Sequence, residues 1–263
     1  MPYKQQDNPQ LCCWVRKPYK EKSFAAFGFF GMRAIFYVDG FNLYNSRLKK
    51  LRQFRWLDIF ALGKALASEG HVLSHVNFYT AYVSGKIDPL AVGKQQAYLA
   101  ALKTNPDINI HAGNFSINNK WVKLLHPPDA RPQGYQWHEP YPEFVMASIP
   151  QEKGSDVKLA AHLVRDGYRG DYDVAYVLTN DTDLIEPIRI VTQELGLEVV
   201  LVPRILPRSP KNPVPPKALK AVSSGFKLIE DEMLAACLLP QQVIKPNGSV
   251  LTCPQDWSES PES

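Results

Sequence analysis

One short stretch decides the fold, and it runs Ala34-Ile35-Phe36-Tyr37-Val38-Asp39-Gly40-Phe41-Asn42. Its first five residues are all apolar and rich in β-branched and aromatic side chains, which is typical of a strand buried on both faces. Asp39 and Gly40 then end the apolar run, as a polar turn does. A strand of this kind needs a layer of helices on each side, so the stretch predicts an α/β domain.

Strand and helix patterns alternate on the C-terminal side of this stretch. Helices are expected at 56–68, 89–103, 157–168 and 183–195, and strands at 72–83, 108–111, 174–178 and 197–202. Pro89 stands where a helix can begin, and Gly196 stands where one can end. The alternation predicts a three-layer, Rossmann-like domain with a mainly parallel central sheet.

The rest of the chain predicts extensions around one domain at 32–204. Residues 1–31 show no periodicity and read as a flexible leader; Met32 would then be the native start. Residues 114–143 are rich in proline, and predict an irregular insertion with one hairpin. Residues 205–245 predict a proline-rich linker and a C-terminal helical extension, with the helical part at 217–238. The polar stretch 246–263 is expected to be disordered.

Composition places the chain among ordinary globular proteins. It has 263 residues, of which 45% are hydrophobic and 21% charged, and a formal net charge of +4. That charge only weakly favours an anionic partner. The four cysteines form no C-x-x-C pair, which argues against a disulfide framework and fits a reducing cytoplasm. No apolar run approaches the ~20 residues that span a bilayer.

Four aspartates fall where parallel sheets bind ligands, beyond the carboxyl ends of strands. Asp39 follows the first strand, Asp181 and Asp183 follow the strand at 174–178, and Asp156 stands at the start of a helix. Taken singly, Asp156 and Asp183 could be helix caps, and Asp39-Gly40 could be a turn. Several carboxylates at one edge would repel each other unless a cation lay between them. Magnesium and manganese prefer such oxygen ligands.

Three segments resemble the signature motifs of NYN domains, in the PIN-like nuclease superfamily. They are V-D-G-F-N-L-Y at 38–44, E-K-G-S-D-V-K-L-A at 152–160 and T-N-D-T-D-L-I-E-P-I at 179–188. Their order and spacing agree with the family, and the resemblance covers about residues 33–202. The third motif departs from the commoner form, which has a small residue where Asn180 stands.

The resemblance implies a metal-dependent endoribonuclease with a three-layer PIN-like fold. Its acidic site maps onto Asp39, Asp156, Asp181 and Asp183, with Mg²⁺ or Mn²⁺ as cofactor. Asp39 and Asp181 would be the main ligands, and the other two would complete the site directly or through waters. The expected substrate contacts are Asn42, Lys153, Thr179 and Asn180. RNA, single-stranded or structured, is the expected partner; no membrane contact is expected, and a homo-oligomer is compatible.

Two further polar features have both a structural and a functional interpretation. Asn42 would orient Asp39 or contact substrate, or it would simply satisfy the backbone of a turn. Lys120-Trp121-Val122-Lys123 mixes basic and aromatic residues, as sites for single-stranded nucleic acid do. A tryptophan packed inside a hairpin is the simpler interpretation of Trp121.

Three other function classes compete with the nuclease, and the third, a toxin or phage-defence effector, would share the same chemistry. The first is a non-catalytic RNA-binding or scaffold module of the same fold; loss of one aspartate would have favoured it, and all four are present. The second is a phosphatase of the haloacid-dehalogenase kind, which resembles D-x-D after the first strand. Here Gly40 and Phe41 follow Asp39, so the second aspartate is absent. The sequence therefore favours the nuclease.

Overall fold

The computed structural model describes residues 31–83, 85, 89–125, 142–203 and 215–258. The expectations for the leader at 1–30, the proline-rich stretch 126–141, the linker 204–214 and the last residues 259–263 lie outside this part of the chain. Within it, every helix is too short or too polar to cross a bilayer.

A seven-stranded sheet organises the fold, with strand order β4-β3-β2-β1-β5-β6-β7. Six of its strands are parallel and only β4 is antiparallel to its neighbour, which confirms the mainly parallel α/β prediction. The central strand is β1, whose last six residues are fully buried. The strands are β1 (Met32–Asp39), β2 (His71–Ala81), β3 (Ile108–Lys123), β4 (Phe144–Lys153), β5 (Val174–Leu178), β6 (Glu198–Val202) and β7 (Gly225–Phe226).

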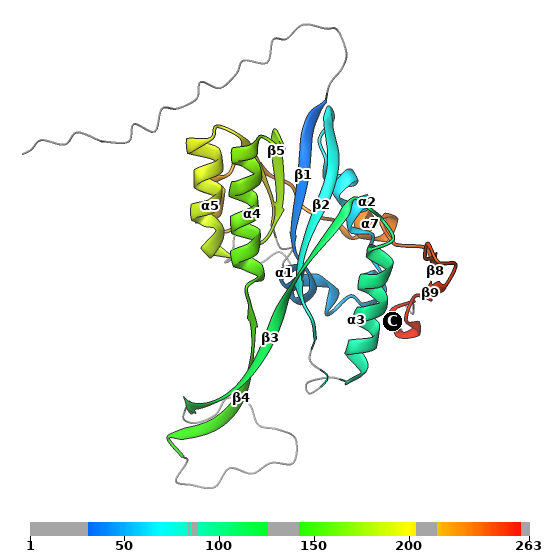
Figure 1. Ribbon diagram of the computed structural model, residues 1–263. Coiled ribbons are helices and arrows are strands. Elements are labelled where there is room, and N and C mark those ends of the chain that lie inside the picture. Colours follow the sequence, from blue (N-terminus) through cyan, green and yellow to red (C-terminus); the bar gives the residue numbers. More distant parts are fainter. Residues whose placement is uncertain (1–30, 84, 86–88, 126–141, 204–214, 259–263) are drawn as a thin grey trace, which may run out of the picture. The chain divides into compact units, whose positions relative to one another are not determined.

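Helices cover both faces of this sheet, as the buried strands require (Figure 1). One face carries α4 (Ser155–Arg169), the helical run of η3 (Thr182–Leu184), α5 (Ile185–Arg189) and η4 (Ile190–Glu194), and α6 (Lys217–Val222). The other face carries α1 (Gly40–Leu43), η1 (Tyr44–Leu48), η2 (Arg52–Phe54), α2 (Ile59–Leu66), α3 (Pro89–Leu102) and α7 (Asp231–Ala236). The helices predicted at 56–68, 89–103, 157–168 and 183–195 are thereby confirmed.

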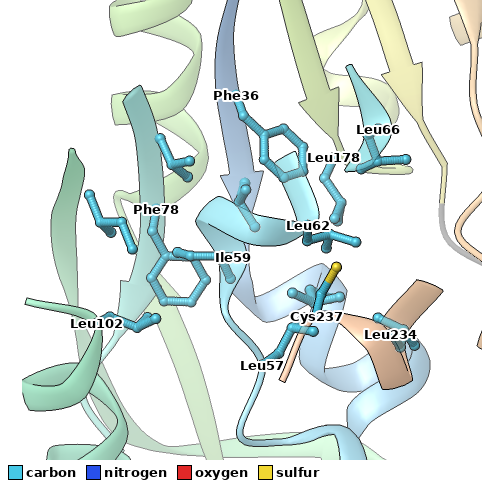
Figure 2. Close-up of a cluster of buried hydrophobic side chains, with 14 of the residues drawn as sticks. Phe36, Leu57, Ile59, Leu62, Leu66, Phe78, Leu102, Leu178, Leu234 and Cys237 are labelled. Carbon is cyan, nitrogen blue, oxygen red and sulfur yellow. The ribbon is translucent and has the colours of Figure 1, made fainter. Parts of the chain in front are cut away.

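Alternate residues of β1 feed two separate cores. Phe36 and Val38 join the core beneath α2, where Figure 2 shows Phe36 near Leu62 and Leu66. Ile35 and Tyr37 point to the opposite face and pack under α4 and α5. This period-two alternation puts the next residue, Asp39, on the α4 face of the sheet.

The predicted irregular insertion, for which one hairpin is expected, begins as a long antiparallel ribbon. β3 continues well past the sheet edge, and residues 114–123 pair with β4 in register, from Asn114 with Lys153 to Lys123 with Phe144. Figure 1 shows this ribbon extending beyond the helices. The hairpin expected within 114–143 therefore corresponds to β3 and β4, but β4 lies at 144–153, beyond the predicted bounds. A ribbon with few buried residues gives only a short apolar alternation, so its length could not be predicted from the sequence.

The C-terminal region adds more structure than expected. The segment 217–238, predicted to be helical, holds α6 and α7 with the two-residue strand β7 between them, so 197–202 is not the last strand. The stretch expected to be disordered is ordered up to residue 258. It contains β9 (Val250–Thr252), which pairs with β8 (Gln242–Ile244), and α8 (Gln255–Ser258). The buried side chains of Cys253 and Trp257 anchor it to the core beneath α2.

Candidate functional site

Asp39 ends β1 and at the same time caps α1, so strand and helix fix its side chain from two sides. Its Oδ1 accepts a hydrogen bond from the Asn42 backbone N–H at 2.9 Å, and its Oδ2 accepts one from Asn42 Nδ2 at 2.7 Å. The hydroxyl of Thr179, at the end of β5, donates to Oδ2 at 3.4 Å. The carboxylate is therefore held in one orientation while only 2% of the residue is exposed.

Gly40 permits this tight join between β1 and α1. A Cβ atom at this position would lie 2.7 Å from the Tyr79 backbone oxygen and 2.7 Å from the Phe78 ring. Both neighbours belong to the buried strand β2, which cannot move aside in a close-packed interior. Glycine at position 40 therefore lets α1 approach β2, and it places Asn42 against Asp39.

Asp181 stands beside Asp39 at the carboxyl end of the next strand, β5. It caps η3, with Oδ1 accepting from the Asp183 backbone N–H at 3.0 Å. The Thr179 hydroxyl accepts from the Asp181 backbone N–H at 3.0 Å while it donates to Asp39. Thr179 is fully buried, and its two hydrogen bonds link the Asp39 carboxylate to the Asp181 backbone. Only a substrate contact was predicted for this residue.

Burial raises the pKa of the Asp39 carboxyl above its ordinary value of 3.8. The hydrogen bonds from Asn42 and Thr179 lower the pKa in part, and the negative charge of Asp181 raises it further. The charged form of Asp39 is thus disfavoured in the folded protein. Binding of a proton or a cation to the Asp39 carboxylate would offset the free-energy cost of burying its negative charge.

We expect Asp39→Asn to stabilise the metal-free protein, and to do so more at pH 8 than at pH 4. Because the folded-state pKa of Asp39 is raised, the folded protein keeps a proton that the unfolded chain releases above about pH 3.8. The folded state therefore loses stability as pH rises to the folded-state pKa, and the variant avoids this loss. Thermal unfolding in EDTA at pH 4, 6 and 8 measures the stability difference between Asp39→Asn and the parent. Asp107→Asn, which changes an exposed carboxylate, is the control. An equal effect at all three pH values would contradict the prediction.

The other predicted residues lie around this pair in more exposed positions. Asp156 is half-buried in the first turn of α4, and the residue that caps this helix is Gly154. Asp183 is exposed in η3, and Lys153 is exposed at the end of β4. Asn180 is half-buried between Thr179 and Asp181. The cap in this loop is thus Asp181, where the sequence suggested Asp183.

No three acidic, histidine or cysteine side chains in the described ranges are close enough to enclose a metal ion. The four aspartates, predicted to line one site with Asp39 and Asp181 as its main ligands, therefore do not form a cluster of three or more ligands in the described ranges. Two carboxylates, Asp39 and Asp181, are close enough to interact electrostatically. Magnesium is commonly bound through one or two carboxylates, with waters and substrate phosphates as its other ligands. The residues present fit a magnesium or manganese ion held by this pair.

A polar row continues from Asp39 across the sheet. Asp39 is in register with Tyr79 of β2, and Tyr79 is in register with His111 of β3. Under α4, the Tyr79 hydroxyl bonds to His162 Nδ1 at 2.9 Å, and the Tyr79 and His111 rings stack at 4.8 Å between centroids. Burial, then the positive charge of His162, lowers the pKa of His111 to about 4, so this imidazole is neutral at pH 7. The period-two alternation of strand residues, which places Asp39 on the α4 face, could have identified Tyr79 and His111 as its neighbours on that face.

Comparisons with known proteins supply one distant relative. No family model matches the chain. The Pseudomonas putida (strain DSM 28022 / S16) protein HspA, named 6-hydroxy-3-succinoylpyridine 3-monooxygenase, is 26% identical over 253 residues, which cover 88% of this chain and 77% of HspA. The chain is a parallel α/β protein related to HspA. The resemblance to NYN domains stays a prediction, because neither the sequence comparisons nor this relative's name contains it.

A solved structure also resembles the chain. It is that of VPA0982 from Vibrio parahaemolyticus RIMD 2210633, a protein of unknown function, with 15% sequence identity and a TM-score of 0.47. The match covers 81% of this chain and 100% of VPA0982.

Proposed function

We propose that this protein hydrolyses phosphodiester bonds in RNA with a magnesium or manganese ion held at Asp39 and Asp181. The observation that carries the proposal is the buried carboxylate of Asp39, oriented by Asn42 and Thr179 and destabilised as an anion by burial and by Asp181. It lies at the carboxyl edge of a parallel sheet, where ligands of such folds bind. When bound, the ion activates water and stabilises charge on the phosphate.

The chain's own residues would position the reacting groups. Asn42 and Thr179 hold the Asp39 oxygens in place, so little rearrangement is needed on binding. Asp156 and Asp183, each in the first turn of a helix on the α4 face, would hold waters of the ion rather than the ion itself. Lys153 is exposed one residue before Gly154, which caps α4, and would contact a phosphate.

The test is an assay of the purified full-length chain on single-stranded RNA, structured RNA and DNA. Cleavage is expected with Mg²⁺ or Mn²⁺ and not in EDTA, and restoring the metal should restore it. Cleavage that survives complete chelation would overturn the metal proposal. Binding without cleavage under every metal condition would instead support a non-catalytic RNA-binding module.

The similarity to HspA favours a second candidate, a monooxygenase that acts on a hydroxylated pyridine. That activity belongs to HspA by name, and the alignment covers 88% of this chain. A monooxygenase puts one oxygen atom of O₂ into its substrate and reduces the other to water with two electrons. Incubating the protein with 6-hydroxy-3-succinoylpyridine, O₂ and a two-electron reductant such as a reduced nicotinamide tests it. Product formation that Asp39→Asn abolishes would favour this candidate over the nuclease.

A further inference from the structure

The residues that follow Asp39 form a stretch of one charge sign. Between 40 and 57, here called the basic segment, there is no acidic residue. Its basic residues are Arg47, Lys49, Lys50, Arg52 and Arg55. The segment covers α1, η1 and η2, and its first helix carries Asn42, which holds the Asp39 carboxylate. A run of basic residues with no acidic one between them is therefore joined directly to the candidate site.

The five cations of the basic segment divide into two groups. Arg47 forms an ion pair with Asp231, and Arg55 donates to the backbone oxygens of Leu48 and Lys49, so these two serve the fold. The other three, Lys49, Lys50 and Arg52, are exposed. None of them forms a salt bridge with another residue in the described part of the chain. They are available to an anion.

Two large aromatic residues are exposed on the same segment. Phe41 is 47% exposed and Tyr44 is 42% exposed, although both follow a strand that is otherwise buried. The Arg55 guanidinium lies 5.4 Å from the centroid of the Tyr44 ring, which places a cation beside an exposed aromatic surface. Exposed aromatic rings beside cations are typical of sites that bind single-stranded nucleic acid.

We propose that the basic segment binds single-stranded nucleic acid and leads its backbone to Asp39. Bases stack on Phe41 and Tyr44, and Lys49, Lys50 and Arg52 contact phosphates. The inference rests on the proposed nuclease function, and it adds the strandedness of the substrate and the surface that holds it. A duplex keeps its bases stacked on each other, so it gains only the phosphate contacts.

The phosphate contacts are tested by the salt dependence of binding. Affinity of a labelled single-stranded RNA is measured by fluorescence anisotropy in EDTA, with all variants made in an Asp39→Asn background so that nothing is cut. A plot of log affinity against log salt has a negative slope, and each lost phosphate contact makes it shallower by about 0.7 for a single strand. Lys49→Gln/Arg52→Gln should therefore make it shallower by about 1.4. The matched control is Lys103→Gln/Arg169→Gln, a lysine and an arginine that are also exposed but lie at the opposite edge of the sheet. Equal slopes for both pairs would overturn the proposal.

The stacking contact is tested by Tyr44→Ala, which should weaken binding of single-stranded RNA roughly 5- to 100-fold. Tyr44→Phe should bind like the parent, and Tyr168→Ala removes a tyrosine that is 66% exposed elsewhere, so it serves as control. The affinity for duplex RNA should change little in Tyr44→Ala and in Tyr44→Phe. Duplex and single strand losing the same affinity would overturn the stacking role.

These results separate the two proposals. Metal-dependent cleavage with unchanged binding in the Lys49/Arg52 and Tyr44 variants would keep the nuclease and reject this surface. Selective loss of binding in those variants, in a chain that never cleaves, would keep the surface and reject the nuclease. Equal binding of single-stranded DNA and RNA would retain the surface, since stacking and phosphate contacts do not distinguish the sugars.

Discussion

Asp39→Asn should lower metal-dependent RNA cleavage by roughly 1,000-fold or more, because the variant loses an anionic ligand at the proposed metal site. Asparagine keeps the size of the side chain, and its oxygen can still accept the hydrogen bond that Asp39 accepts from the Asn42 backbone. The fold should therefore be retained while the charge is lost. Single-turnover cleavage rates at saturating Mg²⁺ give the measurement, and far-ultraviolet circular dichroism confirms folding.

Asp181→Asn should produce a loss of the same order, because the two carboxylates are proposed to share one ion. Asp107→Asn is the matched control, since Asp107 is an exposed carboxylate that precedes β3, at the opposite edge of the sheet. It should cut at the parent rate. If Asp39→Asn and Asp181→Asn both cut as fast as this control, the proposed site is wrong.

The position of Asp39 and Asp181 could be predicted from the sequence because strand order along the chain is visible in it. Each follows a continuous apolar run, and parallel strands bring their carboxyl ends to one edge. What the sequence does not contain is the direction of each side chain. Asp181 turns to cap η3, while Asp156 and Asp183 remain in helical first turns, so the four carboxylates do not converge as a cage. Local hydrogen bonds decide those orientations.

The elements of the fold also divide into those that could be predicted from the sequence and those that could not. Strands and helices with buried faces were predicted from apolar periodicity, and they are present. A hairpin was expected here, but the length of the β3–β4 ribbon and the place of β4 were not predicted, because few of its residues are buried. Trp121, expected to pack inside the hairpin, is 66% exposed. β7 was missed because two residues, Gly225 and Phe226, are too few to show a period. The segment 246–258 was missed because single residues anchor it, with polar residues between them.

Trp257→Ala should lower the free energy of unfolding by about 3 kcal/mol or more, the usual cost of emptying a large aromatic site in a core. Trp257 is only 8% exposed, and its ring lies 6.3 Å from the rings of both Trp56 and Tyr98. It belongs to the core beneath α2, so its loss leaves a cavity between α3 and the segment before α2. Its helix, α8, is also tied to α3 by the bond from Lys94 to Asp256 at 2.7 Å.

Trp121→Ala supplies the matched control, because it deletes the same side chain from an exposed position on the β3–β4 ribbon. Surface changes of this kind usually alter stability by no more than about 0.5 kcal/mol. Urea unfolding followed by circular dichroism at 222 nm compares the two variants without relying on tryptophan emission. Because α8 is short, an alternative is that it detaches alone and leaves the rest of the core intact. A midpoint for Trp257→Ala equal to that for Trp121→Ala would show that this happens, and that residues 246–258 add nothing to the stability of the sheet and its helices.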